Sequence, residues 1–360
     1  MRAQFAILPD GRRHFHDGPI DLILEASGGR GAVAAAYNAA AARFATILDE
    51  LCLELPRLRA AAGARPEGVV ARRMADAVAC FASERFVTPM AAVAGAVAEE
   101  VLAAMVGAAP LDRAYVNNGG DIALHLASET GCDRPPAIPS PLVGEGKGGG
   151  RFGLDAPRRM EQRPRLPPTP ALPHNGGGSA RRRRLSSIGG HDNGASFTIG
   201  LIARPDRPAL FGKARITARD AARGIATSGW RGRSFSLGVA DAVTVISSKA
   251  SLADAAATLI ANAVDLPDHP AISRAPAVSR DPQSDLGDRL VTLAVGPLSA
   301  GEVATALDRG VAEARYWLER GHIAAAALSL CGRTRLVAAD PSLYSFDQPP
   351  LATEARHALG

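Results

Sequence analysis

The pattern of apolar and polar positions predicts strands and helices grouped in turn along most of the chain. Strands are predicted at 4–8, 19–26, 114–126, 196–203 and 288–295, followed by two short strands with the sequences AAALSL and TRLVAA. Helices are predicted at 32–54, 71–82, 90–106, 252–264 and 300–320. Thr88 is a favourable N-cap and Pro89 a favourable first residue for the third helix. This order of elements predicts a single α+β unit.

One long segment, 134–194, does not fit this pattern. It is rich in proline, glycine and arginine and carries a net charge of +7, so the rest of the chain has a net charge of −2. Such a segment cannot bury enough apolar surface to offset its ordering entropy, and we expect it to be disordered. The folded domain would then comprise 1–133 and 195–345, with a C-terminal tail at 346–360. We expect strands 114–126 and 196–203 to pair across a loop tip that carries the insert.

The two halves of this segment, PSPLVGEGKGGG and PTPALPHNGGG, resemble translated palindromic repeat elements, which predicts a passenger insert. An RNA-binding arm is the alternative. The arginine run at 181–184 has no aromatic residue interleaved to stack on bases, and Phe152 is the one aromatic residue of the segment, so we do not expect nucleic acid as a partner.

The composition predicts a cytoplasmic protein without a membrane span. The N-terminus has no apolar run long enough for a signal peptide, and the most apolar helix candidate contains Glu99 and Glu100. Four widely separated cysteines without a CxxC spacing argue against a zinc site and a disulfide framework. The sequence leaves open whether another protein is an acceptor substrate and whether the chain forms a homo-oligomer.

The stretch YVNNGGDIALHL interrupts a predicted strand with Asn117, Asn118, Gly119, Gly120 and Asp121. Glycine weakens a strand interior, so the pair predicts a bulge, a turn or a close approach to the backbone. Bare backbone amides would suit a flat or phosphorylated ligand, and Asp121 could orient a hydroxyl or an amine. A β-bulge with an Asx-type turn is the structural alternative.

A second polar group, Thr227, Ser228 and Gly229, ends an apolar run. Small hydroxyl and glycine residues at a strand end suit a phosphate or a ribose, and equally a tight turn.

The helix predicted at 252–264 carries Asp254, Thr258 and Asn262 four residues apart, on one face. A carboxylate and a hydroxyl one turn apart are hard oxygen ligands suited to Mg²⁺. The alternative is a capping box between Ser251 and Asp254.

Taken in order, these motifs resemble the ApbE-like superfamily, which includes the FAD:protein FMN transferases. The residues that carry the resemblance are the NNGGD segment, ATSG at 226–229, VTV at 243–245 and ADAAAT at 253–258. The chain is more similar still to a branch of that superfamily that is an uncharacterised protein family, through GPIDL at 18–22 and TPMAAVAGAVAEEVL at 88–102. The resemblance implies mixed or antiparallel sheets packed against helices. It also implies FAD or FMN held between the NNGGD strand and the TSG turn.

The same resemblance implies that Mg²⁺ would bind Asp254 and Thr258, and that Thr88 would be among the cofactor-binding residues. The H-x-x-D-P motif of the transferases is missing, because the matching interval reads WRGRSFSLGVADA. Arg231 and Arg233 are candidates for the missing positive charge, and Asp241 is the candidate catalytic residue. Their structural alternatives are a solvated loop and a cap at the start of a strand.

We therefore expect a protein that binds a flavin or a related diphosphate nucleotide with Mg²⁺. As an enzyme it would transfer or cleave at the pyrophosphate. The alternatives are a non-catalytic flavin-binding accessory protein and an enzyme of one-carbon or pterin cofactor assembly.

Overall fold

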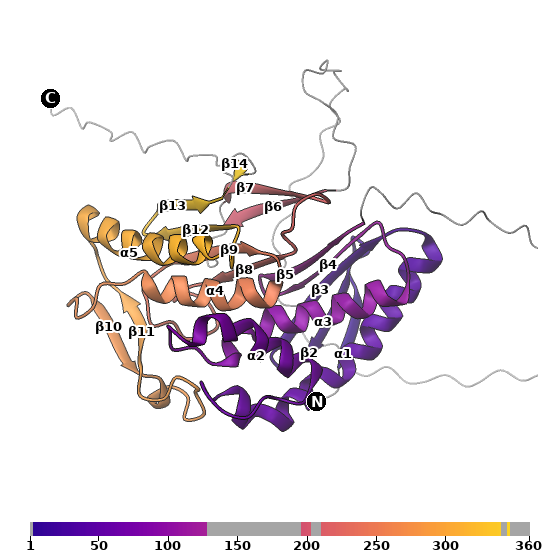
Figure 1. Ribbon diagram of the computed structural model, residues 1–360, viewed down its shortest axis with the longest axis horizontal. Coiled ribbons are helices and arrows are strands. Elements are labelled where there is room, and N and C mark those ends of the chain that lie inside the picture. Colours follow the sequence, from indigo (N-terminus) through magenta and orange to yellow (C-terminus); the bar gives the residue numbers. More distant parts are fainter. Residues whose placement is uncertain (1–2, 128–195, 203–209, 340–343, 346–360) are drawn as a thin grey trace, which may run out of the picture. The chain divides into compact units, whose positions relative to one another are not determined.

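A nine-stranded antiparallel sheet forms the centre of the fold (Figure 1). The computed structural model describes residues 3–127, 196–202, 210–339 and 344–345, so the predicted insert 134–194 and tail 346–360 lie outside the described residues. In spatial order the strands are β1 (Gln4–Ile7), β2 (Arg13–Asp17), β3 (Ile20–Ser27), β4 (Arg113–Asn118), β5 (Asp121–Leu126), β8 (Gly224–Ser228), β9 (Ala242–Ser247), β12 (Ala325–Leu330) and β13 (Arg333–Ala338).

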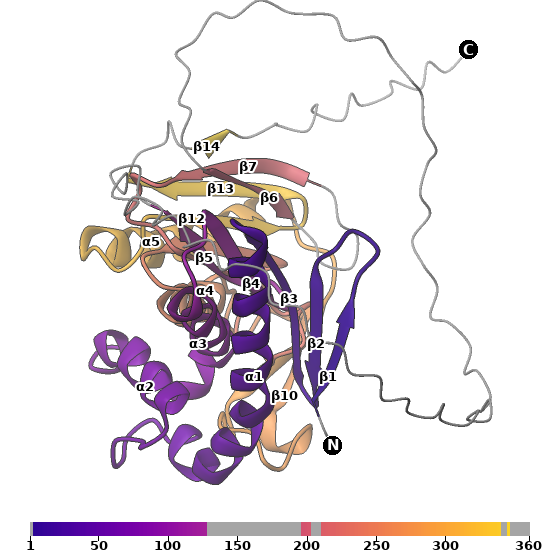
Figure 2. The same cartoon turned by 90° about the vertical axis from the view of Figure 1, so that its right-hand side faces the viewer.

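Helices cover one face of this sheet. They are α1 (Arg30–Leu58), α2 (Val69–Ala82), η1 (Pro89–Ala92), α3 (Val93–Ala108), α4 (Ala250–Ala263) and α5 (Ala300–Glu319). Helices α1, α3, α4 and α5 follow one another across the sheet, and α2 packs on their outer side (Figures 1 and 2). Their buried side chains and those of the facing strands form one large apolar core.

A small sheet covers part of the other face. It contains β6 (Ser196–Ile202), β7 (Leu210–Thr217) and β14 (Tyr344–Ser345), and apolar side chains of β6 and β7 form a second core with β5, β8, β9 and β12 (Figure 2). Strands β9 and β12 are buried at every position because both of their faces are covered. This explains why AVTVIS and AAALSL lack the alternation of a half-exposed strand. A separate pair, β10 (Ile272–Pro276) and β11 (Leu290–Val295), flanks the short helix η2 (Ala277–Ser279).

These observations confirm the α+β class, and every strand pairing among the described residues is antiparallel. Two predictions about strands were wrong. The predicted strand 114–126 is a hairpin of β4 and β5, because Gly119 and Gly120 adopt positive φ angles of 66° and 120° and reverse the chain. It also does not pair with 196–202: β5 pairs with β4 and β8, whereas β6 pairs with β7 in the small sheet.

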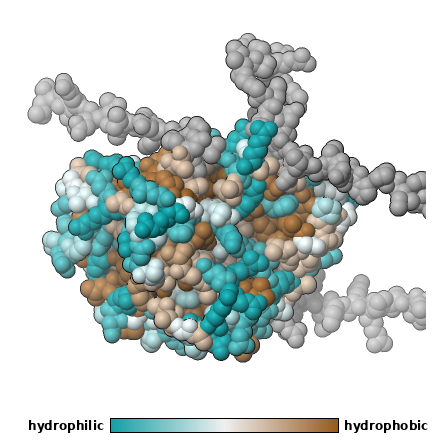
Figure 3. Space-filling view, viewed as in Figure 1, coloured by the Kyte–Doolittle hydropathy of each residue, from teal (hydrophilic) through white to brown (hydrophobic). Residues whose placement is uncertain are grey.

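One described helical segment, Pro89–Ala108, is long and apolar enough to cross a membrane by length and composition alone. Half of it is buried inside this fold, and core helices of soluble proteins have the same properties, so the finding is weak evidence for a membrane span. On the molecular face seen in Figure 3, hydrophilic and apolar side chains are interspersed.

Candidate functional site

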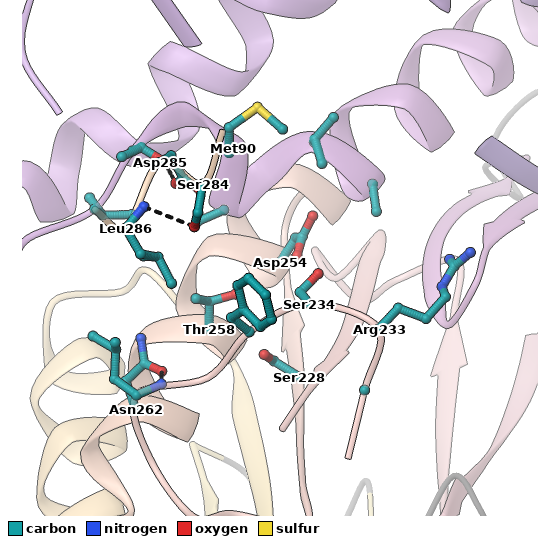
Figure 4. A pocket seen from close by; sticks show the side chains of 18 of the residues that line it. Met90, Ser228, Arg233, Ser234, Asp254, Thr258, Asn262, Ser284, Asp285 and Leu286 are labelled. Atoms are coloured by element: carbon teal, nitrogen blue, oxygen red, sulfur yellow. Dashed lines mark hydrogen bonds between the residues drawn. The ribbon is translucent and has the colours of Figure 1, made fainter. Parts of the chain in front are cut away.

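A cavity of about 400 Å³ lies beside the start of α3, along α4, and at the ends of β5 and β8 (Figure 4). Its volume falls within the range of small-molecule sites. It brings together seven of the residues predicted from the sequence, namely Thr88, Asp121, Thr227, Ser228, Gly229, Asp254 and Thr258. The NNGGD segment, the TSG turn and the polar face of α4 therefore meet at one cavity, although they are far apart in the chain.

The other predicted residues of the NNGGD segment hold the turn in shape and do not line the cavity. The side-chain oxygen of Asn117 accepts a hydrogen bond from the amide of Gly120 (2.8 Å), which is the Asx-type turn expected as the structural alternative. Asn118 is buried, and its side chain donates to the carbonyl of Ala94 (3.2 Å). This bond attaches the hairpin tip to the start of α3.

Asp121 joins two of the predicted motifs directly. Its carboxylate accepts a hydrogen bond from the amide of Thr227 (3.1 Å), so the hairpin and the end of β8 are held together at the cavity wall. Burial raises the pKa of Asp121 to about 7, and this effect outweighs the hydrogen bond from Thr227 and the positive charge of Arg233.

Asp254 lines the cavity from the N-terminal part of α4. Its carboxylate accepts a hydrogen bond from the amide of Gly95 (3.0 Å), near the N-terminus of α3. Burial, and then the negative charge of Asp121, raise the pKa of Asp254 well above its ordinary value. Two carboxylates that disfavour each other's ionisation thus line the same cavity.

The two helices exchange their N-terminal caps. Asp254 of α4 binds an amide in the first turn of α3, and Glu99 of α3 accepts hydrogen bonds from the amide (2.7 Å) and hydroxyl (2.8 Å) of Ser251 in α4. The predicted alternative of a capping box between Ser251 and Asp254 is therefore wrong. Helix α4 begins after Lys249, which provides no side-chain cap.

Gly95 makes this exchange possible. A Cβ atom at Gly95 would lie 2.3 Å from the carbonyl oxygen of Ala250, so only glycine lets the starts of α3 and α4 approach this closely. The close approach brings the Gly95 amide within reach of Asp254 and fixes the direction of that carboxylate.

The carboxylate oxygens of Asp121 and Asp254 are the kind of ligand that a hard divalent cation prefers. Asp121 and Asp254 have main-chain amides as their hydrogen-bond partners and form no ion pair within 4 Å among the described residues. Thr258 lines the cavity one turn further along α4. The described residues contain no group of three or more His, Cys, Asp or Glu placed to hold a metal. Mg²⁺ suits such a site, because it commonly uses one or two carboxylates and takes its other ligands from phosphates and water.

Asp241, the candidate catalytic residue, does not line the cavity. It is 3% exposed, and its carboxylate accepts hydrogen bonds from the side chain of Arg231 (2.6 Å) and the amide of Cys331 (2.7 Å). Both carboxylate oxygens are thus engaged, and the residue connects the start of β9 to the turn after β12.

Sequence reasoning missed one wall of the cavity. It contains apolar side chains from four separate regions, namely Phe86, Met90, Phe235, Leu259 and Leu286. The individual positions are ordinary core residues by sequence, and only the tertiary structure brings them together at the cavity that the polar groups also line.

A loop between η2 and β11 adds polar groups to the same wall. Ser284, Asp285 and Leu286 of this loop line the cavity at the end away from Arg233 (Figure 4). The hydroxyl of Thr88 donates to the carboxylate of Asp285, so Thr88 connects this loop to η1 and does not cap the helix as predicted.

Comparison with known proteins identifies the family. The chain matches a family described as "AbpE bacteria" over residues 5–134 and 190–336, which is well over half of its length. The chain belongs to this family. The match is interrupted at 135–189, nearly the interval predicted as an insert.

The chain is also similar to UPF0280 protein MK0206 of Methanopyrus kandleri, with 38% identity over 99 residues. That region is 27% of this chain and 41% of the relative, so the chain matches less than half the length of that protein.

These findings correct the family suggested by the sequence motifs. The chain belongs to the family described as "AbpE bacteria" and is similar over part of its length to a UPF0280 protein, so the assignment to the ApbE-like superfamily of FAD:protein FMN transferases was wrong. The motifs behind that assignment are four short segments, and glycine turns, Thr-Ser-Gly ends and Asp-containing helices serve many ligands and many structural purposes.

Proposed function

We propose that this protein binds a flavin nucleotide, FAD or FMN, or a related diphosphate nucleotide, together with Mg²⁺. The proposal rests on one observation: Asp121 and Asp254, from distant parts of the chain, line the same cavity. Two half-buried carboxylates that line one cavity and have raised pKa values are costly to ionise unless a cation neutralises them.

Magnesium supplies the neutralising charge and a bridge to phosphate oxygens. Asp121, Asp254 and the hydroxyl of Thr258 would hold it, because all three residues line the cavity and the carboxylates have no competing ion pair in the described structure. When bound, the ion would neutralise charge that develops on a pyrophosphate during cleavage or transfer. The main-chain amides that hold the two carboxylates keep this arrangement fixed without the ion.

The apolar wall supports a ligand with a flat ring system. Met90, Phe235 and Leu286 offer apolar surface to the same cavity that the carboxylates line. A nucleotide combines both requirements, because it has an aromatic base or flavin ring at one end and phosphates at the other.

The test is a fluorescence titration of FAD in the presence and absence of Mg²⁺, with mass spectrometry of any small molecule that co-purifies. We expect FAD binding to require Mg²⁺, to be lost on chelation and to weaken at least about tenfold in Asp254→Asn. Asp308→Asn is the matched control, because it removes a carboxylate that is 68% exposed on α5, away from the cavity. A wild-type protein that binds none of FAD, FMN or ADP with Mg²⁺ would refute the proposal.

A non-catalytic flavin-binding role is the second candidate. It is favoured by the position of Asp241, whose carboxylate is engaged by Arg231 and Cys331 outside the cavity lining. Incubation with Mg²⁺ and FAD, followed by chromatography for AMP and FMN, separates the two roles, since a carrier returns FAD unchanged.

A further inference from the structure

The space above the glycine turn is already occupied by an arginine. A Cβ atom at Gly119 would lie 2.2 Å from Nη2 and 3.3 Å from Cζ of Arg233. The guanidinium group of Arg233 therefore packs directly on the bare main chain of the β4–β5 turn. The bare main chain at Gly119, which suggested contact with a ligand, is instead in contact with the guanidinium group of Arg233.

Arg233 lies at the polar end of the cavity. It lines the cavity on the side of Ser228 and Asp254, away from Asp285 (Figure 4). Its positive charge acts on Asp121, yet among the described residues it makes no side-chain hydrogen bond and no ion pair within 4 Å. Packing on Gly119 thus holds its five N–H donors in place, and the part of the chain that the structure describes offers them no acceptor.

Arg231, the other arginine considered from the sequence, is already engaged. Its side chain donates to the carboxylate of Asp241 (2.6 Å) and stacks on the ring of Trp230, with 4.4 Å from Cζ to the ring centroid. Arg231 does not line the cavity. Of the two arginines, only Arg233 has donors available at the cavity.

We propose that Arg233, seated on Gly119, binds the phosphate of the nucleotide and so sets its direction in the cavity. This inference rests on the proposed function. A guanidinium group matches phosphate oxygens in a fixed, forked geometry, and its positive charge complements an anion bridged to the site by Mg²⁺. The phosphates would lie between Arg233 and Asp254, and the ring would lie toward Met90 and Leu286.

The turn offers a matched pair of glycine variants. At Gly119 an added Cβ would displace the Arg233 guanidinium, whereas at Gly120 it would meet nothing within 4 Å. Both glycines have positive φ, so both alanine variants carry backbone strain. Only Gly119→Ala prevents Arg233 from packing on the turn. Comparing it with Gly120→Ala therefore separates the loss of this contact from backbone strain in the turn.

The experiment compares binding of FMN and riboflavin, which differ by the phosphate, in Mg²⁺ buffer. Wild type should prefer FMN, and Arg233→Ala should weaken FMN binding roughly 10- to 100-fold while leaving riboflavin binding unchanged. Arg233→Lys should fall between the two, because lysine keeps the charge but not the fork. Gly119→Ala should resemble Arg233→Ala, Gly120→Ala should resemble wild type, and Gly119→Ala should add no further loss in an Arg233→Ala background.

The proposal is overturned if Arg233→Ala binds FMN like wild type, or loses FMN and riboflavin to the same extent. A residue that served only as a counter-charge to Asp121 would give a different result: its removal would strengthen binding of Mg²⁺ alone and leave the preference for FMN unchanged. Failure of the proposed function is distinguishable, because wild type would then bind neither flavin. Inorganic pyrophosphate with Mg²⁺ then replaces FMN as the probe, and weaker binding by Arg233→Ala still decides the role of this residue.

Discussion

Asp121→Asn should stabilise the protein at alkaline pH when no divalent cation is present. The folded protein holds the Asp121 proton up to a pKa of about 7, compared with 3.8 for an ordinary aspartate. Between these two values the folded state binds more protons than the unfolded state, so stability falls as pH rises through this window. Asparagine is neutral throughout and can still accept the hydrogen bond from the Thr227 amide.

The size of the effect follows from the displaced pKa. Each tenfold change in proton affinity corresponds to about 1.4 kcal/mol, so complete ionisation of Asp121 at pH 8 removes up to about 4 kcal/mol. Water in the cavity screens the charge, and we expect a gain of about 2 kcal/mol for Asp121→Asn at pH 8. The gain should shrink steadily as the pH is lowered toward 4, where the wild-type carboxyl is protonated when folded and increasingly protonated when unfolded.

Urea unfolding of both proteins at several pH values between 4 and 8, with a chelator present, measures this difference. Excess Mg²⁺ at pH 8 should stabilise wild type and leave the variant unchanged, because binding to the folded state alone raises stability. Asp241→Asn is the control of opposite sign, since it weakens the hydrogen bond from Arg231 and should destabilise the protein. Equal dependence of stability on pH for wild type and Asp121→Asn would show that folding does not raise the pKa of Asp121.

Three further results are expected. Glu99→Ala leaves the Ser251 amide without its acceptor and should lower the free energy of unfolding by about 1 kcal/mol in urea titrations, and an unchanged midpoint would contradict the exchanged caps. Gly95→Ala forces apart the starts of two helices, because its Cβ would lie 2.3 Å from the Ala250 carbonyl oxygen. It should cost about 1–3 kcal/mol and reduce Mg²⁺-dependent FAD binding, whereas full retention of both would argue against this close packing. Deletion of residues 134–194 should leave solubility and the circular dichroism spectrum unchanged, and loss of soluble protein would count against a passenger insert.

Local sequence patterns were sufficient where one segment determines the outcome. The spacing of Asp254, Thr258 and Asn262 placed all three on one face of a helix, and the structure puts all three on the cavity wall. The α+β class followed from the same kind of periodicity. Gly119 and Gly120 likewise predicted a bulge, a turn or a close approach to the backbone, and the structure has a turn there.

Features that depend on distant segments could not be read from the sequence. Asp254 and Ser251 form a capping-box pattern by spacing, but acceptors from another helix replace it. Nothing near Gly119 in the sequence indicates that Arg233 fills the space above it. The sequence also could not predict which strands pair, because alternation shows which side of a strand is buried but does not identify the neighbouring strand.

The exchange of caps between α3 and α4 divides the site between two stretches of chain. Residues 3–127 supply Asp121, Glu99 and the Gly95 amide, and the residues after 195 supply Asp254 and Ser251. Neither stretch holds a complete binding site, and each one caps the N-terminus of a helix in the other. Two polypeptides produced by cutting within the intervening segment would therefore depend on each other to fold, and recovery of ligand binding on mixing would report their reassembly.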